Sequence, residues 1–166
     1  TGGIPAEFVG APGLVSSVIT KSGGANFSGS VRYDREDDSL VADNENSPEA
    51  AFQRDDLALT LSGPIVNGDK AWFFGSYREV NREDDITTLD TGAFLRTVER
   101  EDQQGFLKAS WAITDAHTLQ GTYLDDPATI SGSTSRTVVA NRDRSQEQGG
   151  ERYIANYTGI LGPTVL

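Results

Sequence analysis

The chain of 166 residues contains no cysteine, no methionine and a single histidine, His117. Without cysteine it has no disulfide framework, no thiolate metal site and no cysteine nucleophile, and one histidine rules out a histidine-rich metal centre. Apolar runs are short as well, and none approaches the roughly 20 residues that a membrane-spanning helix needs. This shortage excludes helical spans but leaves open a membrane β-barrel, whose strands carry a much weaker signal.

Basic residues are scarce too. Lys and Arg number 14 against 25 Asp and Glu, which gives a net charge of −11. A nucleic-acid binder needs a basic surface, so this balance argues against a nucleic-acid partner. The sequence begins at Thr1 without an initiator methionine or a signal peptide, which predicts a mature or partial product.

The acidic residues are concentrated in three windows. Residues 34–56 hold nine acids and two bases, residues 79–103 eight acids and three bases, and residues 125–151 five acids and three bases. Each window is also rich in Asn, Ser, Gly, Thr or Pro, which is the composition of loops. The sequence therefore predicts three long solvated loops at these places.

Between the windows, apolar and polar residues alternate with period two, which indicates strands. No stretch carries an amphipathic helical pattern, so the chain is predicted to be all-β. We expect an antiparallel meander of six or seven strands, near residues 27–36, 53–66, 70–80, 103–114, 117–125, 148–161 and 164 onward.

Short turns alternate with the long windows along the chain. Asn67-Gly68, residues 114–117 and Gly162-Pro163 are turn signals, and Asn-Gly is among the strongest for a hairpin. In a meander, all short turns then lie at one end and all long loops at the other. Outer-membrane barrels have this asymmetry, whereas long loops are uncommon in compact domains. The pattern favours a membrane barrel over a soluble β-sandwich without excluding the sandwich.

Two blocks of the sequence resemble a known family. Residues 15–29, VSSVITKSGGANFSG, together with residues 2–8, resemble the junction between plug and barrel in TonB-dependent receptors. Residues 61–77, LSGPIVNGDKAWFFGSY, resemble the second and third barrel strands of the same receptors, and the likeness is nearest to the Oar-like branch. Residues 9–14 depart from the family pattern.

The resemblance implies a fragment of a large transmembrane outer-membrane β-barrel in a Gram-negative cell. Residues 1–26 would be the end of the plug domain, and residues 27–166 the N-terminal strands of the barrel. The intact protein would bind a substrate at the cell surface and take it up with energy from the TonB complex. Its partners would be outer-membrane lipid, the remaining barrel strands and plug, and TonB, which would contact parts of the protein outside this chain.

No group of residues points to an enzyme, a cofactor or a metal site. The acidic run 34–38 could attract a divalent cation but lacks EF-hand spacing. Gly23-Gly24 lacks the order of a phosphate loop and fits either the junction or a hairpin turn. His117 is predicted to be a solvated or hydrogen-bonded turn residue, and Asp115 with His117 makes no triad. The adjacent acids Asp125 and Asp126 do not define a glycosidase pair.

Three functions remain open: a TonB-dependent transporter, a non-transporting structural or adhesive barrel that could be a subunit of a larger membrane assembly, and a soluble carbohydrate-binding β-sandwich. In the first two, the three acidic windows would lie outside the cell, where their charge favours divalent cations or cationic ligands. The substrate cannot be read from the sequence.

The period-two pattern also predicts which side chains face lipid. A charge at Leu59 would cost about 2–4 kcal/mol if that residue lies near the bilayer midplane. The residues expected to face lipid are Leu57, Leu59, Leu61, Leu107, Trp111, Leu119, Tyr123 and Tyr157. Those expected to face the lumen or the plug are Ser28, Ser30, Arg32, Thr60, Ser62, Lys108, Ser110, Gln120, Thr122 and Asn156.

Overall fold

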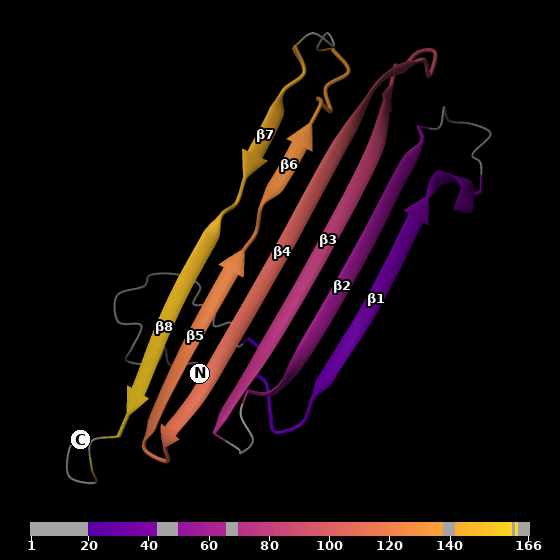
Figure 1. The fold of residues 1–166 in the computed structure, drawn as a ribbon. Helices are drawn as coiled ribbons and strands as arrows, with labels where there is room; N and C mark the ends of the chain where they lie inside the picture. The colour runs from indigo at the N-terminus through magenta and orange to yellow at the C-terminus, as the bar shows by residue number, and fades with distance from the viewer. Residues whose placement is uncertain (1–19, 43–49, 66–69, 138–141, 161, 163–166) are drawn as a thin grey trace, which may run out of the picture.

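The computed structural model describes residues 20–42, 50–65, 70–137, 142–160 and 162. These residues form a single antiparallel sheet and one short 3-10 turn (Figure 1). Among them, no helix is long and apolar enough to cross a membrane. The elements are β1 (Ser28–Asp37), η2 (Asp38–Leu40), β2 (Phe52–Pro64), β3 (Ala71–Thr87), β4 (Phe94–Thr114), β5 (His117–Asp125), β6 (Ala128–Ser131), β7 (Ser145–Gln148) and β8 (Glu151–Gly159).

The strands follow one another in space as they do in sequence. Their order is β1-β2-β3-β4-β5-β8, with β6 pairing β4 and β7 pairing β6. The register of β5 on β4 continues unchanged into β6, since Asp125 lies opposite Gly105 and Ala128 opposite Asp102. Thus β5 with β6, and β7 with β8, each form one interrupted strand. The predicted all-β antiparallel meander of six or seven strands is confirmed as a path of six.

The two interruptions lie side by side. Pro127 has no N–H to give to a strand ladder, although its carbonyl still accepts from the Gln103 N–H at 2.9 Å. On the neighbouring strand, Gly149 has a positive φ of 98°, and a Cβ there would clash with the Asp126 carbonyl. The Gly150 N–H donates to the Asp126 carboxylate at 3.1 Å. Proline and glycine therefore break the two strands at one shared level.

One of the predicted long loops is largely strand and another is partly strand, which corrects the sequence interpretation. Residues 79–87 complete β3 and residues 94–103 begin β4, so only residues 88–93 connect them. Residues 128–131 and 145–148 of the third window form β6 and β7. Both the charge and the loop-like composition of these windows conceal their strands. Charged residues can extend a strand where opposite charges share a face, as Arg82 and Asp84 do on β3.

The connections alternate between the two ends of the sheet, as in the predicted meander (Figure 1), but the one between β3 and β4 has six residues, as many as the one between β2 and β3. Residues 65–70 and 115–116 join strands at one end, here called the short-turn end. Residues 38–51, 88–93 and 132–144 connect strands at the other, the long-loop end. The Asn67-Gly68 turn, Pro163 and the strand expected from residue 164 lie outside the described residues.

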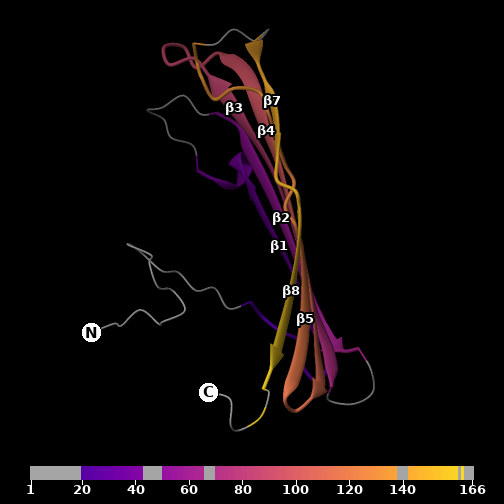
Figure 2. The same cartoon turned by 90° about the vertical axis from the view of Figure 1, so that its left-hand side faces the viewer.

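The sheet is a single layer with two different faces (Figure 2). Among the described residues, the buried apolar side chains are only Val98 and Ala128, which are 7% and 8% exposed. The sheet is open, with β1 at one edge and β8 at the other. The register places all residues expected to face lipid on one face, here the leucine face. All those expected to face the lumen lie on the other, here the arginine face.

The segment before β1 contacts the arginine face. Lys108 of β4 donates to the Thr20 hydroxyl at 3.2 Å, and its side chain is only 7% exposed although the sheet has no second layer. Gly23 lies so close to the backbone of β3 that a Cβ would clash with the Phe73 carbonyl. Residues 20–23 thus approach the sheet on the face where the end of a plug was expected, while residues 1–19 lie outside the described residues.

Replacing Gly23 by alanine is expected to lift this segment from the sheet. The obstructing atom belongs to the Phe73 backbone and cannot move aside like a flexible side chain. We expect Lys108 to lose its contact with Thr20 and to be acetylated faster, as measured by mass spectrometry. Gly24→Ala is the matched control, because a Cβ at Gly24 meets nothing within 4 Å. Equal acetylation rates in the two variants would contradict this account of the junction.

Candidate functional site

A short motif recurs along the first four long strands. An arginine is followed two positions later by an aspartate at residues 32–34, 35–37, 54–56, 82–84 and 100–102. Residues i and i+2 of a strand point to the same face, so each motif places a guanidinium beside a carboxylate. All five pairs form ion pairs, with N–O distances between 2.6 and 3.2 Å.

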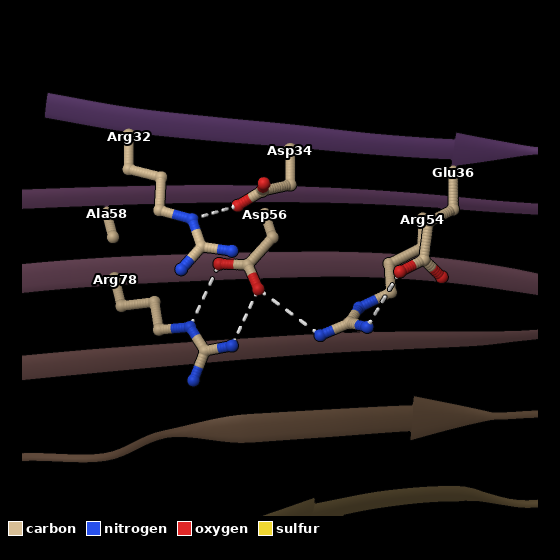
Figure 3. A pocket seen from close by; sticks show the side chains of 7 residues that line it. All are labelled: Arg32, Asp34, Glu36, Arg54, Asp56, Ala58 and Arg78. Atoms are coloured by element: carbon tan, nitrogen blue, oxygen red, sulfur yellow. Dashed lines mark hydrogen bonds and ion pairs between the residues drawn. The ribbon is translucent and has the colours of Figure 1, made fainter.

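Asp56 of β2 joins these pairs into a network across strands (Figure 3). Its carboxylate accepts two hydrogen bonds from Arg78 of β3, at 2.9 Å from Nε and 2.6 Å from Nη2. It also pairs with Arg54 at 3.2 Å, and Arg54 reaches Glu36 of β1 at 3.3 Å. The Arg78 hydrogen bonds and charge lower the pKa of Asp56, whose residue is only 8% exposed.

The network lines a shallow hollow of about 330 Å³ on the arginine face. Figure 3 shows its side chains converging from β1, β2 and β3, with Arg32 bound to Asp34 at one margin. The three arginines and three acids that line it balance one another in charge. The hollow therefore offers paired polar groups rather than a strong field of one sign.

Charge is divided unequally between the two faces of the sheet. The strands carry eight bases and five acids on the arginine face, but one base and ten acids on the leucine face. The bases of the arginine face are Arg32, Arg54, Arg78, Arg82, Arg96, Arg100, Lys108 and Arg152, and its acids are Asp34, Glu36, Asp56, Asp84 and Asp102. The leucine face carries Arg35 with Asp37, Asp55, Glu79, Glu83, Asp85, Glu99, Glu101, Asp125, Glu147 and Glu151.

On the leucine face, tyrosines separate an apolar zone from an acidic zone. Apolar residues such as Leu61, Leu107 and Trp111 occupy the part near the short-turn end, and they are 48–55% exposed. The acids lie toward the long-loop end. Between the two zones stands one tyrosine on each of four strands, here called the tyrosine line: Tyr33 on β1, Tyr77 on β3, Tyr123 on β5 and Tyr153 on β8.

Every hydroxyl of the tyrosine line donates to a carboxylate on its acidic side. Tyr33 donates to Asp55, and Tyr77 donates to Glu79 at 2.9 Å. Tyr123 and Tyr153 both donate to Glu151, at 3.3 and 3.0 Å. The rings therefore lie with their polar tips toward the acids and their apolar bodies toward the leucines, which suits a boundary between a wet and an apolar environment.

The tyrosine line is oblique to the strands. Tyr77 lies one same-face position nearer the short-turn end than Tyr33, and Tyr123 and Tyr153 lie one position nearer again. Two same-face positions are four residues, which correspond to about 13 Å along a strand. The five strand spacings from β1 to β8 correspond to about 24 Å across the sheet. The slope is then about 30°, near the 35–45° by which strands tilt in membrane barrels. In a barrel tilted by this amount, the tyrosines would stand at nearly one height.

Other residues singled out in the sequence have ordinary structural roles. The acidic run is divided, since Asp34 and Glu36 point to the arginine face and Asp37 to the leucine face. Asp37 caps η2 through Ser39, and the hydrogen bonds from Ser39 and Arg35 lower its pKa to about 2. Within the residues described, no group of three metal-ligating side chains could hold a metal ion.

His117 begins β5 rather than lying in the turn. Its Nδ1 lies 2.6 Å from the Tyr157 hydroxyl and the two rings stack, so His117 is hydrogen-bonded, which was one of the two alternatives, and it stands at the start of the predicted strand 117–125. Asp125 points to the leucine face, while Asp126 accepts from Gly150 at the strand interruption. These two carboxylates are not arranged as a pair.

The ion-pair network and the tyrosine line were missed in the sequence. The repeated Arg-x-Asp spacing could have revealed which arginines and aspartates share a face. Comparison of the chain with family models, with curated proteins and with solved structures gave no match.

Proposed function

We propose that this chain is a segment of a TonB-dependent outer-membrane receptor, in which the sheet is an arc of the barrel wall. The leucine face would contact lipid, and the arginine face would line the lumen. The observation that carries this proposal is the tyrosine line, with an apolar zone below it and hydrogen-bonded acids above it. The parts of the strands on the short-turn side of the tyrosine line, which would lie within the bilayer, are residues 28–33, 57–64, 71–77, 105–114, 117–123 and 153–159.

The exposed apolar zone supports lipid as the environment of the leucine face. Burying such a surface contributes roughly 25 cal/mol per Å², yet Leu61 and Tyr157 remain 55% and 61% exposed. A bilayer would cover them. A soluble sandwich would need a second sheet over the same zone, and no described part of the chain lies there.

The arginine face supports a lumen. Most of it carries hydroxyls, amides and charged groups, which suits the polar interior of a membrane barrel. The segment from Thr20 to Gly23 reaches this face before the chain enters β1. A plug that ends here would fill the barrel from within, as the family resemblance implies. Energised uptake rests on that resemblance alone, and a non-transporting barrel is the alternative.

Cysteine labelling can test both location and orientation, because the chain has no cysteine of its own. Thr91→Cys places a thiol in the connection at the long-loop end, and Asp115→Cys places one in a turn at the other end. In intact cells, a membrane-impermeant maleimide should label only the first variant, and lysis should expose the second. The protein should also sediment with the outer membrane.

Three measurements test the proposed location, orientation and function. Recovery of the protein in a soluble fraction would overturn the membrane proposal, and labelling of Asp115→Cys alone in intact cells would reverse the orientation. If the outer-membrane protein binds the purified C-terminal domain of TonB, transport is supported. If it does not, the structural or adhesive barrel is the better assignment.

A further inference from the structure

A second hollow, of about 550 Å³, lies between residues 20–21 and strands β2 to β5. It has an apolar floor, although it opens on the arginine face. Phe74 and Phe106 meet at 5.9 Å between ring centroids, and Leu124 lies opposite Phe106 in the register. All three are half-buried. A lumen wall that serves only to hold water and a polar plug would not need this floor.

Polar groups of several kinds surround the apolar floor. Arg78 borders it on β3 and Gln104 on β4, and Lys21 stands on the side of the N-terminal segment. Arg78 donates hydrogen bonds from Nε and Nη2 to the Asp56 carboxylate. Among the described residues, its Nη1 has no acid partner. Asp126 also lines the hollow, and Asp125 borders it, although the Asp125 side chain points to the leucine face. One guanidinium nitrogen and one ammonium group can therefore reach an anion, while Asp126 disfavours a ligand of higher negative charge.

Size and composition both suit a small molecule. Ligand sites are commonly 300–1,000 Å³, mostly apolar, with a few polar groups that fix orientation. We propose that this hollow binds a small amphipathic anion, with a flat apolar body on Phe74 and Phe106 and a single carboxylate directed to Arg78 and Lys21. This deepens the proposed function by giving the class of substrate, and it rests on that function in taking the arginine face as the lumen.

Isothermal titration calorimetry of the detergent-solubilised protein with 2-naphthoate tests the proposal. We expect saturable binding, and weaker binding of the neutral 2-naphthylmethanol at the same detergent concentration. Arg78→Gln should weaken naphthoate binding about tenfold, as loss of a hydrogen bond to a charged group does. Lys21→Gln, at an exposed position outside the ion-pair network, should weaken it about threefold.

Arg82→Gln is the matched control for Arg78→Gln. Arg82 lies on the same strand and face and holds Asp84 with two hydrogen bonds, but it does not line the hollow. Its loss should leave naphthoate binding unchanged. Equal weakening by Arg82→Gln and Arg78→Gln, no effect of Lys21→Gln, or equal affinity for the acid and the alcohol would each overturn the proposal.

The calorimetry and the cysteine labelling can fail independently of each other. If naphthoate fails to bind while Thr91→Cys is labelled in intact cells, the ligand assignment is wrong and the receptor proposal stands. If naphthoate binds with the expected pattern to a protein found outside the outer membrane, the hollow is a ligand site and the receptor proposal is wrong.

Discussion

Replacing Leu61 by arginine is expected to lower the free energy of unfolding in a phospholipid bilayer by about 2–4 kcal/mol, the cost of such a charge near the midplane. Leu61 lies on β2 two same-face positions from Leu57, which stands opposite Tyr33 of the tyrosine line. It is 55% exposed and surrounded by other residues of the apolar zone. Denaturant unfolding of the reconstituted protein measures the effect.

The loss in free energy of unfolding should depend on the position of the arginine along the strand. Leu59 is the residue at which the sequence suggested a midplane charge. The register sets it opposite Tyr77, which places it at the boundary rather than at the centre of the apolar zone. We therefore expect Leu59→Arg to cost less than Leu61→Arg. Equal costs at the two positions would contradict the tyrosine line as a boundary.

Ser62→Arg is the control for the other face. Ser62 is adjacent to Leu61 but points to the arginine face, where a charge would meet water and polar groups. Substitutions on a wetted surface usually change stability by less than about 0.5 kcal/mol. If Leu61→Arg is as mild as Ser62→Arg, the leucine face does not contact lipid.

The path of the sheet could be predicted because strands leave a local signal. Alternation of apolar and polar residues over residues 57–62 and 107–113 fixes both the strand and its faces. The same rule applied to residues 79–87 would have found the rest of β3, since arginines at 78 and 82 alternate with acids at 79 and 83. Charge does not indicate a loop where basic and acidic residues alternate in this way.

The candidate sites could not be predicted, because they depend on cross-strand register. Asp56 and Arg78 are 22 residues apart in sequence, and Tyr123 and Glu151 are 28 apart. A shift of one residue in the pairing would turn every side chain to the other face. Apolar residues on the polar face, such as Phe106, were a local signal, but only the register brings Phe106 beside Leu124.

Asp56→Asn is expected to destabilise the sheet by about 2 kcal/mol. Removing one partner of a buried ion pair costs about 3–5 kcal/mol. Here solvent reduces that cost, because the side chains of Arg78 and Arg54 are 45% and 34% exposed. The substitution removes the negative charge that Arg54 and Arg78 share. The two guanidinium groups then lie near each other with no carboxylate between them. Denaturant unfolding of the reconstituted protein measures the loss.

Asp84→Asn provides the comparison for this network. Asp84 also accepts two hydrogen bonds from one arginine, but its side chain is 32% exposed and it binds Arg82 alone. An exposed pair of this kind contributes about 0–1 kcal/mol. If Asp56 joins strands β1 to β3, its replacement should cost more than that of Asp84 and should not add to Arg78→Gln, because both substitutions remove the same hydrogen bonds. Additive losses, or equal losses at the two aspartates, would show that the network is a set of independent surface pairs.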